Sequence, residues 1–302
     1  MKYYFVFNPA AGQGPKGKLF LENYNKIKEL NKYDINIYET VGVGDSTRFV
    51  AEICTKYPDE DICFFSCGGD GTMNEVVTGV ANYPNAILGI IPTGSCNDFL
   101  KTFPDYDFMN LEDQLNGIIM PCDLLKVDEF YSLNVTNIGF DAKVNYDQIR
   151  LRPKFNNNVK KAYNNAIVRN LLRPLGDQVC IKVDGKEVYN RKSLLMAFGN
   201  ARYYGGGYNC TPQASVNDGL IDVIIINKVS ILKFARLISK YKQGLIYGNP
   251  KYQNFCTSLK GKKIEVESPK VLTICIDGET IHRNRVTIEV LPHKFRFLLP
   301  RK

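Results

Sequence analysis

Short apolar runs alternate with amphipathic stretches through the first 120 residues of the chain. Strand-type runs lie at 3–7, 35–38, 62–67 and 87–91, and helical spacing separates them at 19–30, 47–56 and 73–81. Strands that alternate with helices form right-handed βαβ units around a mostly parallel sheet. The pattern therefore predicts an α/β domain over residues 1–123.

The pattern changes after Pro121 to short alternating runs that are separated by turn signals such as Asp184-Gly185. Such runs predict an antiparallel β-sandwich over residues 124–293, with helices near 145–172 and 231–243. The strand-type runs lie at 179–183, 220–226, 264–266, 271–276 and 286–290. A last apolar run at 295–299 is predicted to add a strand to the first domain, which residues 294–302 would complete.

Composition narrows the class of protein. The 302 residues hold no apolar run near the ~18 that a membrane span needs, and the first residues lack the features of a signal peptide. We therefore expect a cytoplasmic protein. Nine scattered cysteines without a C-x-x-C pair and only two histidines argue against a disulfide framework, a zinc centre and a Ser/His/Asp triad. Carboxylates would then be the groups that accept or donate protons in any reaction of this protein.

Positive charge is concentrated in one segment. The chain carries a formal net charge of +8, and eight Lys and Arg residues lie between Lys143 and Leu175 against the single acid Asp147. Clusters of this kind bind nucleic-acid phosphates or anionic lipid head groups, but they also occur as solvated helical faces. Charge alone leaves these readings open.

Each predicted strand of the first domain ends in a polar or glycine-rich loop, at 8–12, 40–45, 68–72 and 92–98. In an open parallel sheet such loops meet at the carboxyl edge, which is where ligands bind. The loop at 68–72, Gly68-Gly69-Asp70-Gly71-Thr72, indicates phosphate binding. Its glycines would let the backbone approach an anion, and the next helix would supply amide donors. The alternative is an ordinary strand-to-helix turn in which Asp70 stabilises the helix N-terminus.

Three further details refine this loop. Thr72 and Glu75 have the spacing of a capping box, which would fix the start of the helix. Neither a Walker A loop nor a G-x-G-x-x-G dinucleotide motif is present. Asp70 and Asp98, at the ends of adjacent loops, suit a hydrated Mg²⁺ ion that bridges phosphate oxygens.

These motifs, taken in order, resemble the diacylglycerol kinase catalytic-domain superfamily, in its branch of soluble bacterial lipid kinases related to sphingosine kinases. The resemblance rests on Asn8-Pro9 with Gly12, on residues 68–75 and on Pro92-Thr93-Gly94-Ser95 through Phe99. It continues through 123–127, 134–142, 203–207, 212–222 and 276–279, which covers nearly the whole chain. It implies a Rossmann-like nucleotide-binding domain, similar to NAD kinase and phosphofructokinase, followed by a β-sandwich that binds lipid.

The resemblance also implies roles for single residues. Asp70, Asp98 and Asp123 would organise a catalytic Mg²⁺ and its waters, and Asp277 or Glu279 would accept the proton of the lipid hydroxyl. Without the resemblance, Asp277-Gly278 is equally typical of a hairpin turn. The nucleotide would be held by Asn8, Pro9, Ala10, Ala11, Gly12, Thr40, Gly69, Asp70, Gly71, Thr72, Met73, Asn74, Glu75 and Ser95.

A second, structural Mg²⁺ is implied at Ser215, Asp218 and Leu220, through two carbonyls and one carboxylate. A plain Asn-Asp-Gly turn is the alternative, because the spacing alone is weak evidence for oxygen ligands. The segment 247–251 also lacks a histidine that is frequent in the family near this point.

The sequence thus predicts an ATP- and Mg²⁺-dependent lipid kinase of phospholipid biosynthesis. The resemblance to the family implies diacylglycerol as its acceptor. The expected partners are the lipid substrate and an anionic membrane face, which the basic 143–173 segment would contact. No nucleic-acid partner is expected, and a homodimer is left open. Two alternatives are an NAD kinase-like enzyme with a small soluble substrate and a nucleotide-binding regulatory module without catalysis.

Overall fold

The computed structural model describes residues 1–11 and 13–302, so the Gly12 of the first loop lies outside the described residues. The chain forms two compact units. Unit 1 comprises Met1–Leu124 together with Pro292–Lys302, and unit 2 comprises Leu125–Leu291. In the described part of the chain, no helix is both long and apolar enough to cross a membrane.

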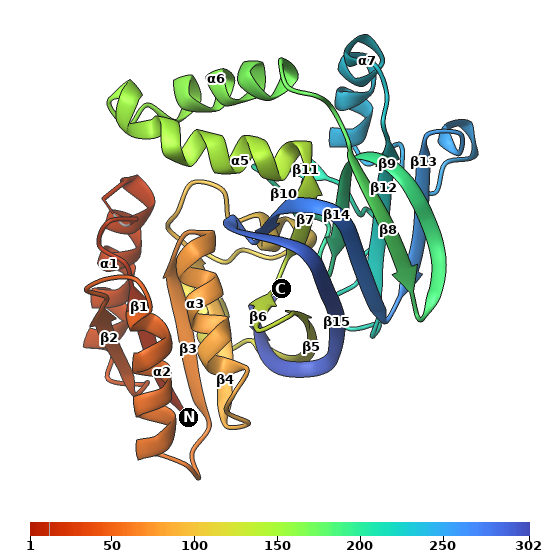
Figure 1. Ribbon diagram of the computed structural model, residues 1–302. Coiled ribbons are helices and arrows are strands. Elements are labelled where there is room, and N and C mark those ends of the chain that lie inside the picture. Colours follow the sequence, from red (N-terminus) through yellow and green to blue (C-terminus); the bar gives the residue numbers. More distant parts are fainter. Residues whose placement is uncertain (12) are drawn as a thin grey trace. The chain divides into compact units, whose positions relative to one another are not determined.

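Unit 1 is built on a parallel sheet. Its strands lie in the order β2, β1, β3, β4 and the end of β15, where Arg296 and Phe297 pair with Ile87 and Leu88. The returning strand predicted from the last apolar run thus joins this sheet next to β4 (Figure 1). The bounds are β1 Lys2–Phe7, β2 Ile35–Glu39, β3 Ile62–Gly68, β4 Ala86–Pro92, β5 Ile118–Val127 and β15 Glu279–Leu299.

Helices cover both faces of this sheet, because its strands are apolar on both faces. On one face Phe5 stacks on Phe65 and meets Phe20 and Tyr24 of the first helix. On the other face Phe49 packs against strand residues. The helical bounds are α1 Pro15–Glu29, α2 Asp45–Lys56, α3 Asp70–Val80, the 3₁₀ turn η1 Asp98–Thr102 and α4 Leu111–Leu115. The predicted α/β class is confirmed.

Unit 2 is an antiparallel sandwich that is made by long, shared strands. The first half of β9 pairs with β8, whereas its second half pairs with β7 and β12. Likewise β14 pairs with β8 through 264–267 and with β7 through 274–276. The bounds are β6 Phe130–Ser132, β7 Val135–Gly139, β8 Asp177–Val183, β9 Lys186–Gly199, β10 Tyr203–Tyr204, β11 Tyr208–Asn209, β12 Ile221–Asn227, β13 Cys256–Gly261 and β14 Lys263–Ile276.

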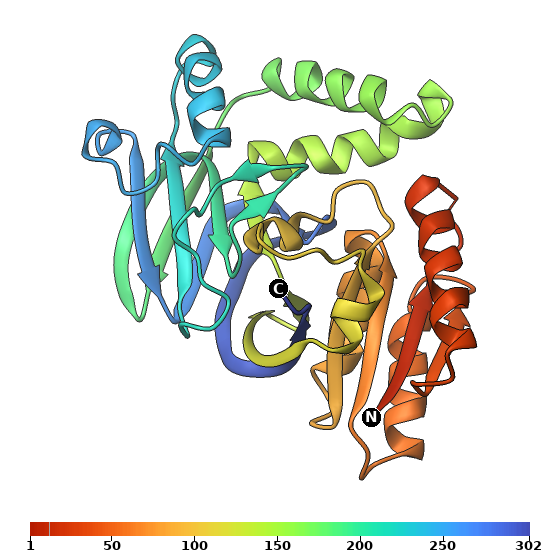
Figure 2. The same cartoon turned by 180° about the vertical axis from the view of Figure 1, so that it is seen from behind.

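Two apolar cores stabilise unit 2. One lies within the sandwich and includes Val179, Phe198 and Ile264, all fully buried. The other lies under the helices and includes Ala166, Leu195 and Ile224. The helical elements, seen from both sides in Figures 1 and 2, are α5 Phe140–Leu151, η2 Arg152–Phe155, α6 Val159–Leu171, α7 Ile231–Lys242 and η3 Pro250–Tyr252.

One strand of unit 2 differs from its prediction. The apolar runs at 264–266 and 271–276 belong to a single strand, β14, and not to two strands. Its register against β15 shifts between Glu267 and Leu272, where the polar residues of the gap pass through a bulge. A bulge interrupts the alternation of side chains, which is why the sequence pattern indicates two strands.

Candidate functional site

The loops after β1, β2, β3 and β4 meet at one edge of the unit 1 sheet, because the four strands run parallel. The loop after β4 crosses directly over the loop after β3. The amide of Gly94 donates to the carbonyl of Gly68 at 2.9 Å. A Cβ atom on Gly94 would lie 2.3 Å from the Cα of Gly69, so only glycine allows this approach.

Asp70, the first residue of α3, holds these two loops together. Its Oδ1 accepts a hydrogen bond from the amide of Asp98 at 3.0 Å, and its Oδ2 accepts one from the amide of Asn97 at 3.2 Å. Asn97 has a positive φ of 47° and donates from its side chain to the Gly68 carbonyl at 3.0 Å. The carboxylate of Asp98 is buried and pairs with Lys101. The predicted acids Asp70 and Asp98 are therefore brought together.

The first loop joins the same edge through Asn8. Its side-chain amide donates to the Thr72 hydroxyl at 3.0 Å, while its carboxamide oxygen accepts from the amides of Ala10 and Ala11 at 3.0 and 3.4 Å. The loop after β2 begins beside it, because the amide of Thr40 donates to the carbonyl of Phe7. Asn8, Thr40 and Thr72 of the predicted nucleotide set thus lie at one edge.

The capping box predicted from Thr72 and Glu75 is wrong. The helix α3 begins at Asp70, its N-cap is Gly69 without a side-chain cap, and Thr72 already lies within the first turn. Glu75 instead accepts hydrogen bonds from the amides of Gly44 at 2.9 Å and Ser46 at 3.4 Å. Its role is to tie the loop after β2 to α3, a long-range contact that spacing along the chain does not reveal.

The other predicted residues of unit 1 fall into two environments. Met73 is buried, and Ser95 is exposed beside Gly94. Asp123 is fully buried in β5, where its Oδ1 accepts from the amide of His293 at 2.8 Å. Asp123 thereby fixes the returning C-terminal segment to unit 1.

The residues present fit a Mg²⁺ ion that is held through water. Among residues 1–11 and 13–302, no group of three or more His, Cys, Asp or Glu lies close enough to bind a metal directly. The Asp70 carboxylate nevertheless lies beside the backbone of Asp98, so that both acids belong to this edge, and Mg²⁺ is usually bound through one or two carboxylates, waters and substrate phosphates.

In unit 2, Asp277 closes the turn between β14 and β15 in a left-handed conformation, with φ of 46°. Its carboxylate accepts hydrogen bonds from the amides of Leu133, Asn134 and Val135 at 2.6, 3.1 and 3.0 Å, and from the Ser132 hydroxyl at 3.0 Å. Asp277 therefore anchors the segment that leads into β7. Glu279, the other predicted acid, is exposed two residues later.

Comparisons with known proteins match both units. Residues 2–127 match the diacylglycerol kinase catalytic domain, and residues 134–299 match the YegS C-terminal NAD kinase beta sandwich-like domain. The chain belongs to the family of diacylglycerol kinase-like lipid kinases. The resemblance of the motifs, and the pairing of a Rossmann-like unit with a β-sandwich, are thus confirmed.

Relatives of this lipid kinase cover nearly all of its length. A "Probable lipid kinase YegS-like" of Pectobacterium atrosepticum is 30% identical over 91% of this chain and 90% of its own. A "Diacylglycerol kinase" of Bacillus subtilis is 26% identical over 91% and 88%. The crystal structure of a Bacillus anthracis protein, provisionally named a diacylglycerol kinase, superposes with a TM-score of 0.76 at 26% identity, over 99% of this chain and 96% of that one.

The structural Mg²⁺ that the family implies does not fit unit 2 of this lipid kinase. The Oδ2 atom of Asp218 pairs with the Lys260 ammonium at 3.1 Å, and its Oδ1 accepts from the amide of Leu220 at 3.1 Å. Lys260 also pairs with the fully buried Asp222 at 3.0 Å. A lysine ammonium therefore already neutralises these carboxylates. The other two predicted ligand atoms are the carbonyl oxygens of Ser215 and Leu220.

Sequence reasoning missed a half-buried acid, Asp141. Burial raises the pKa of Asp141 to about 6, although hydrogen bonds oppose the shift, first among them the one from the Tyr204 hydroxyl at 2.5 Å. The Tyr204 hydroxyl lies 3.1 Å from the Tyr241 hydroxyl, so Asp141, Tyr204 and Tyr241 form a chain of hydrogen bonds that is partly buried. A carboxyl group that titrates near neutrality is a candidate for chemistry. Only the fold shows it, because Asp141 and Tyr204 are 63 residues apart.

Proposed function

We propose that this member of the family transfers the γ-phosphate of ATP to the hydroxyl of diacylglycerol, which gives phosphatidic acid. The kinase family implies the use of ATP. The observation that carries the proposal is the joint between the loops after β3 and β4, where Asp70 holds Asn97 and Asp98. Phosphoryl transfer depends mainly on positioning and on neutralising charge, and this joint is suited to both.

In the proposed reaction, unit 1 binds and orients the nucleotide. The first-turn amides of α3 lack partners within the helix and donate toward phosphate oxygens. Asn8 keeps Thr72 in place and Glu75 keeps the loop after β2 in place, so that the loops are rigid before ATP binds. When bound at Asp70 and Asp98, Mg²⁺ would neutralise the negative charge of the phosphates.

Unit 2 would supply the proton acceptor for the lipid hydroxyl, through Asp277 or Glu279. Asp277 is already committed to backbone amides, so its loss would also loosen the segment at 132–135. Glu279 is exposed, so its loss would leave the fold intact. Asp277→Asn and Glu279→Gln therefore have to be compared in turnover per folded molecule, with the folded fraction measured by urea unfolding.

The function is tested by transfer of label from [γ-³²P]ATP, with Mg²⁺, into lipids presented in mixed micelles. We expect labelled phosphatidic acid from diacylglycerol, and loss of label in one of the two acid variants. The panel includes phosphatidylglycerol, a monoacylglycerol and a sphingoid base, with NAD as a soluble acceptor. Label in another lipid would correct the acceptor, and label in NAD would replace the lipid reaction with that of an NAD kinase. ATP binding without any transfer would indicate a regulatory module.

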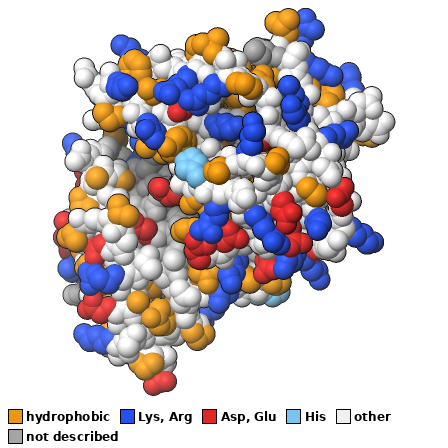
Figure 3. Space-filling view, viewed as in Figure 1, with side chains coloured by type: hydrophobic (Ala, Val, Ile, Leu, Met, Phe, Trp, Pro, Cys, Tyr) orange, Lys and Arg blue, Asp and Glu red, His pale blue; other side chains and the backbone are white. Residues whose placement is uncertain are grey.

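We also propose that the helical hairpin of α5 and α6 contacts an anionic membrane face. On the face seen in Figure 3, Lys and Arg side chains gather where α5 and α6 lie in Figure 1. Lys160 and Lys161 are exposed at the start of α6, on a helix that also exposes Val159 and Val168. Exposed cations beside exposed apolar side chains are typical of a helix that rests on a membrane surface.

Replacing Lys160 and Lys161 together with glutamine is expected to weaken this contact. Each cation near an anionic surface contributes roughly 1 kcal/mol, so the double variant would bind vesicles about 30-fold more weakly. Sedimentation with vesicles of phosphatidylglycerol and phosphatidylcholine measures the change. Lys186 and Lys192, exposed on β9, give a matched control pair. Equal binding by wild type and double variant would rule out docking through α6.

A further inference from the structure

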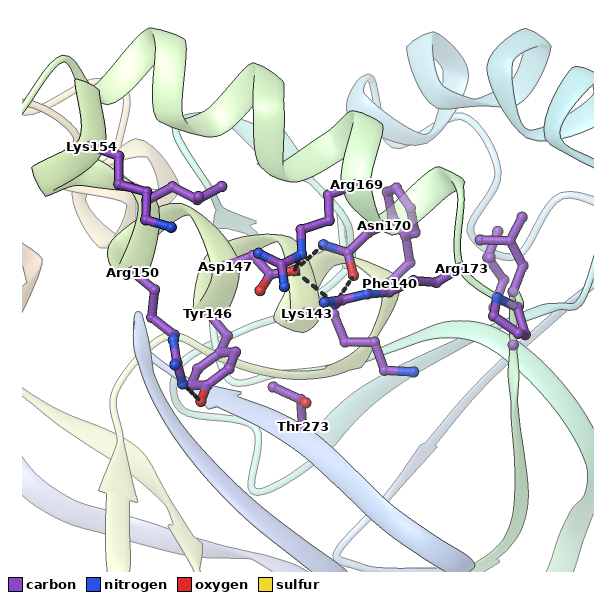
Figure 4. Close-up of a pocket in the computed structure, with 15 residues that line it drawn as sticks. Phe140, Lys143, Tyr146, Asp147, Arg150, Lys154, Arg169, Asn170, Arg173 and Thr273 are labelled. Carbon is purple, nitrogen blue, oxygen red and sulfur yellow. Dashed lines mark hydrogen bonds and ion pairs between the residues drawn. The ribbon is translucent and has the colours of Figure 1, made fainter.

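A cavity of about 700 Å³ lies wholly within unit 2, between the α5–α6 hairpin and the sheet (Figure 4). Helix α5 contributes residues 140, 143, 146, 147, 150 and 151, which recur at the spacing of one helix face. Residues 169–170 of α6 and the segment 173–176 close the other side, and Leu194 and Thr273 come from the strands. None of the residues that line it belongs to the loops of unit 1.

The cavity is strongly basic. Five cationic side chains line it against one carboxylate, that of Asp147; the five are Lys143, Arg150, Lys154, Arg169 and Arg173. Asp177 lies nearby and pairs with Lys143 at 2.7 Å. Even when Asp147 and Asp177 are both counted, the cationic side chains at the cavity outnumber the carboxylates.

The single lining carboxylate organises the cations and does not neutralise them. Asp147 is buried, and its Oδ2 accepts hydrogen bonds from Asn170 at 2.8 Å and from Arg173 at 2.8 Å. Arg169 comes no closer to it than 3.9 Å. Figure 4 shows Arg169 and Arg173 converging on Asp147 from the α6 side, with Lys143 alongside and Thr273 beneath. The carboxylate thus holds the guanidinium group of Arg173 by a hydrogen bond and leaves that of Arg169 free to bind an anion.

Two other cations at the cavity have no acidic partner in the part of the chain that the structure describes. Arg150 lies over the ring of Tyr146, 5.1 Å from its centre, and donates to its hydroxyl, and Lys154 forms no ion pair. A concave, low-dielectric wall lined by charges of one sign concentrates counter-ions. Guanidinium groups bind phosphate oxygens in pairs of parallel hydrogen bonds.

The rest of the lining indicates what carries the anion. Phe140, Leu151, Pro174, Leu175 and Leu194 give the cavity an apolar wall beside its cations. A free inorganic ion has no apolar surface to bury against this wall, whereas the first carbons of a chain that is esterified to phosphate would pack against it.

We propose that this cavity is a binding site for a phosphate monoester, with a lipid-linked head group as its occupant. None of the residues that line the cavity is among those to which we assign a role in phosphotransfer. Arg150, Arg169 and Arg173 bind the phosphate oxygens, Asp147 holds Arg173 in place, and the apolar wall receives the glycerol and ester carbons. The proposal does not depend on the acceptor of the kinase reaction.

Calorimetry with dihexanoyl phosphatidic acid, below its micelle concentration and at physiological salt, tests the site. We expect saturable binding that Arg150→Gln with Arg169→Gln weakens about 10- to 100-fold, because charge-assisted hydrogen bonds are lost. Both side chains are exposed, so the variant keeps its fold, which urea unfolding verifies. Lys186→Gln with Lys192→Gln removes the same charge from β9 outside the cavity and is expected to bind the lipid like wild type.

The other ligands identify the source of the phosphate. Dihexanoyl phosphatidylcholine, which lacks a dianionic phosphate, is expected not to bind. Inorganic phosphate that binds as tightly as the lipid, with the same loss in the arginine variant, would keep the phosphate site but make a free phosphate its ligand. Absence of saturable binding by both phosphates, or equal binding of the lipid by wild type and arginine variant, would overturn the proposal.

Discussion

Asp70→Asn is expected to lower turnover about 10²- to 10³-fold, which is the loss that removal of one electrostatic group from a transfer site causes. The substitution removes a negative charge next to Asp98, where the proposed Mg²⁺ would bind. It also replaces one carboxylate oxygen by an NH₂ group. That group would face the amide of Asn97 or Asp98, which now donates to oxygen at 3.2 or 3.0 Å.

Asp70→Asn is also expected to lower the stability of the fold. A residue that contributed only its charge to catalysis would not have this effect. A buried amide left without its acceptor costs roughly 1–3 kcal/mol, so we expect a fall of that size in the free energy of unfolding. Transfer of label from ATP and urea unfolding measure the two effects. Asp59→Asn, at an exposed turn, is the matched control and should change neither. More than a tenth of wild-type turnover in Asp70→Asn would remove Asp70 from the mechanism.

Gly94→Ala is expected to separate the loops after β3 and β4. The new Cβ would lie 2.3 Å from the Cα of Gly69, 2.8 Å from its nitrogen and 3.0 Å from the Gly68 carbonyl oxygen. All three are backbone atoms, which cannot rotate away. Overpacking and the loss of the Gly94–Gly68 hydrogen bond together predict a loss of about 2–4 kcal/mol in the free energy of unfolding.

The displaced loop carries Asn97 and Asp98 away from Asp70, so ATP binding should weaken as well, by at least about 10-fold if one charge-assisted hydrogen bond is lost. Urea unfolding and titration with ATP measure the two effects. Gly71→Ala is the matched control for stability, because its Cβ meets no heavy atom within 4 Å. It should unfold at the same urea concentration as wild type or a higher one, since alanine favours the helix. An unchanged midpoint in Gly94→Ala would contradict the close approach of the two loops.

Some features of the site follow from single residues and their order along the chain. The alternation of β3, α3 and β4 follows from local apolar periodicity, and it places the ends of parallel strands at one edge. The glycines around Asp70 mark the loop because glycine permits close backbone approach. Periodicity fails at β14, where a bulge breaks the side-chain alternation.

The partners of the polar side chains could not be read in this way. Glu75 has the spacing of a local cap, yet it binds Gly44 and Ser46, about 30 residues away. Lys260 of β13 pairs with Asp222 of β12 and with Asp218, which precedes β12. The family pattern implies a metal at this place. A charged side chain pairs with whichever opposite charge the fold brings near, and sequence spacing does not encode that distance.

The sequence by itself determined the two-domain plan, the kinase family and the loops that carry the acids. These depend on apolar period, glycine positions and motif order, which are local properties of the chain. Only the tertiary structure decided that Asp70 clamps a second loop, that burial raises the pKa of Asp141 to about 6, and that five cations surround one cavity. Hydrogen bonding, desolvation and electrostatic field depend on distances between groups far apart in sequence, and folding alone sets those distances.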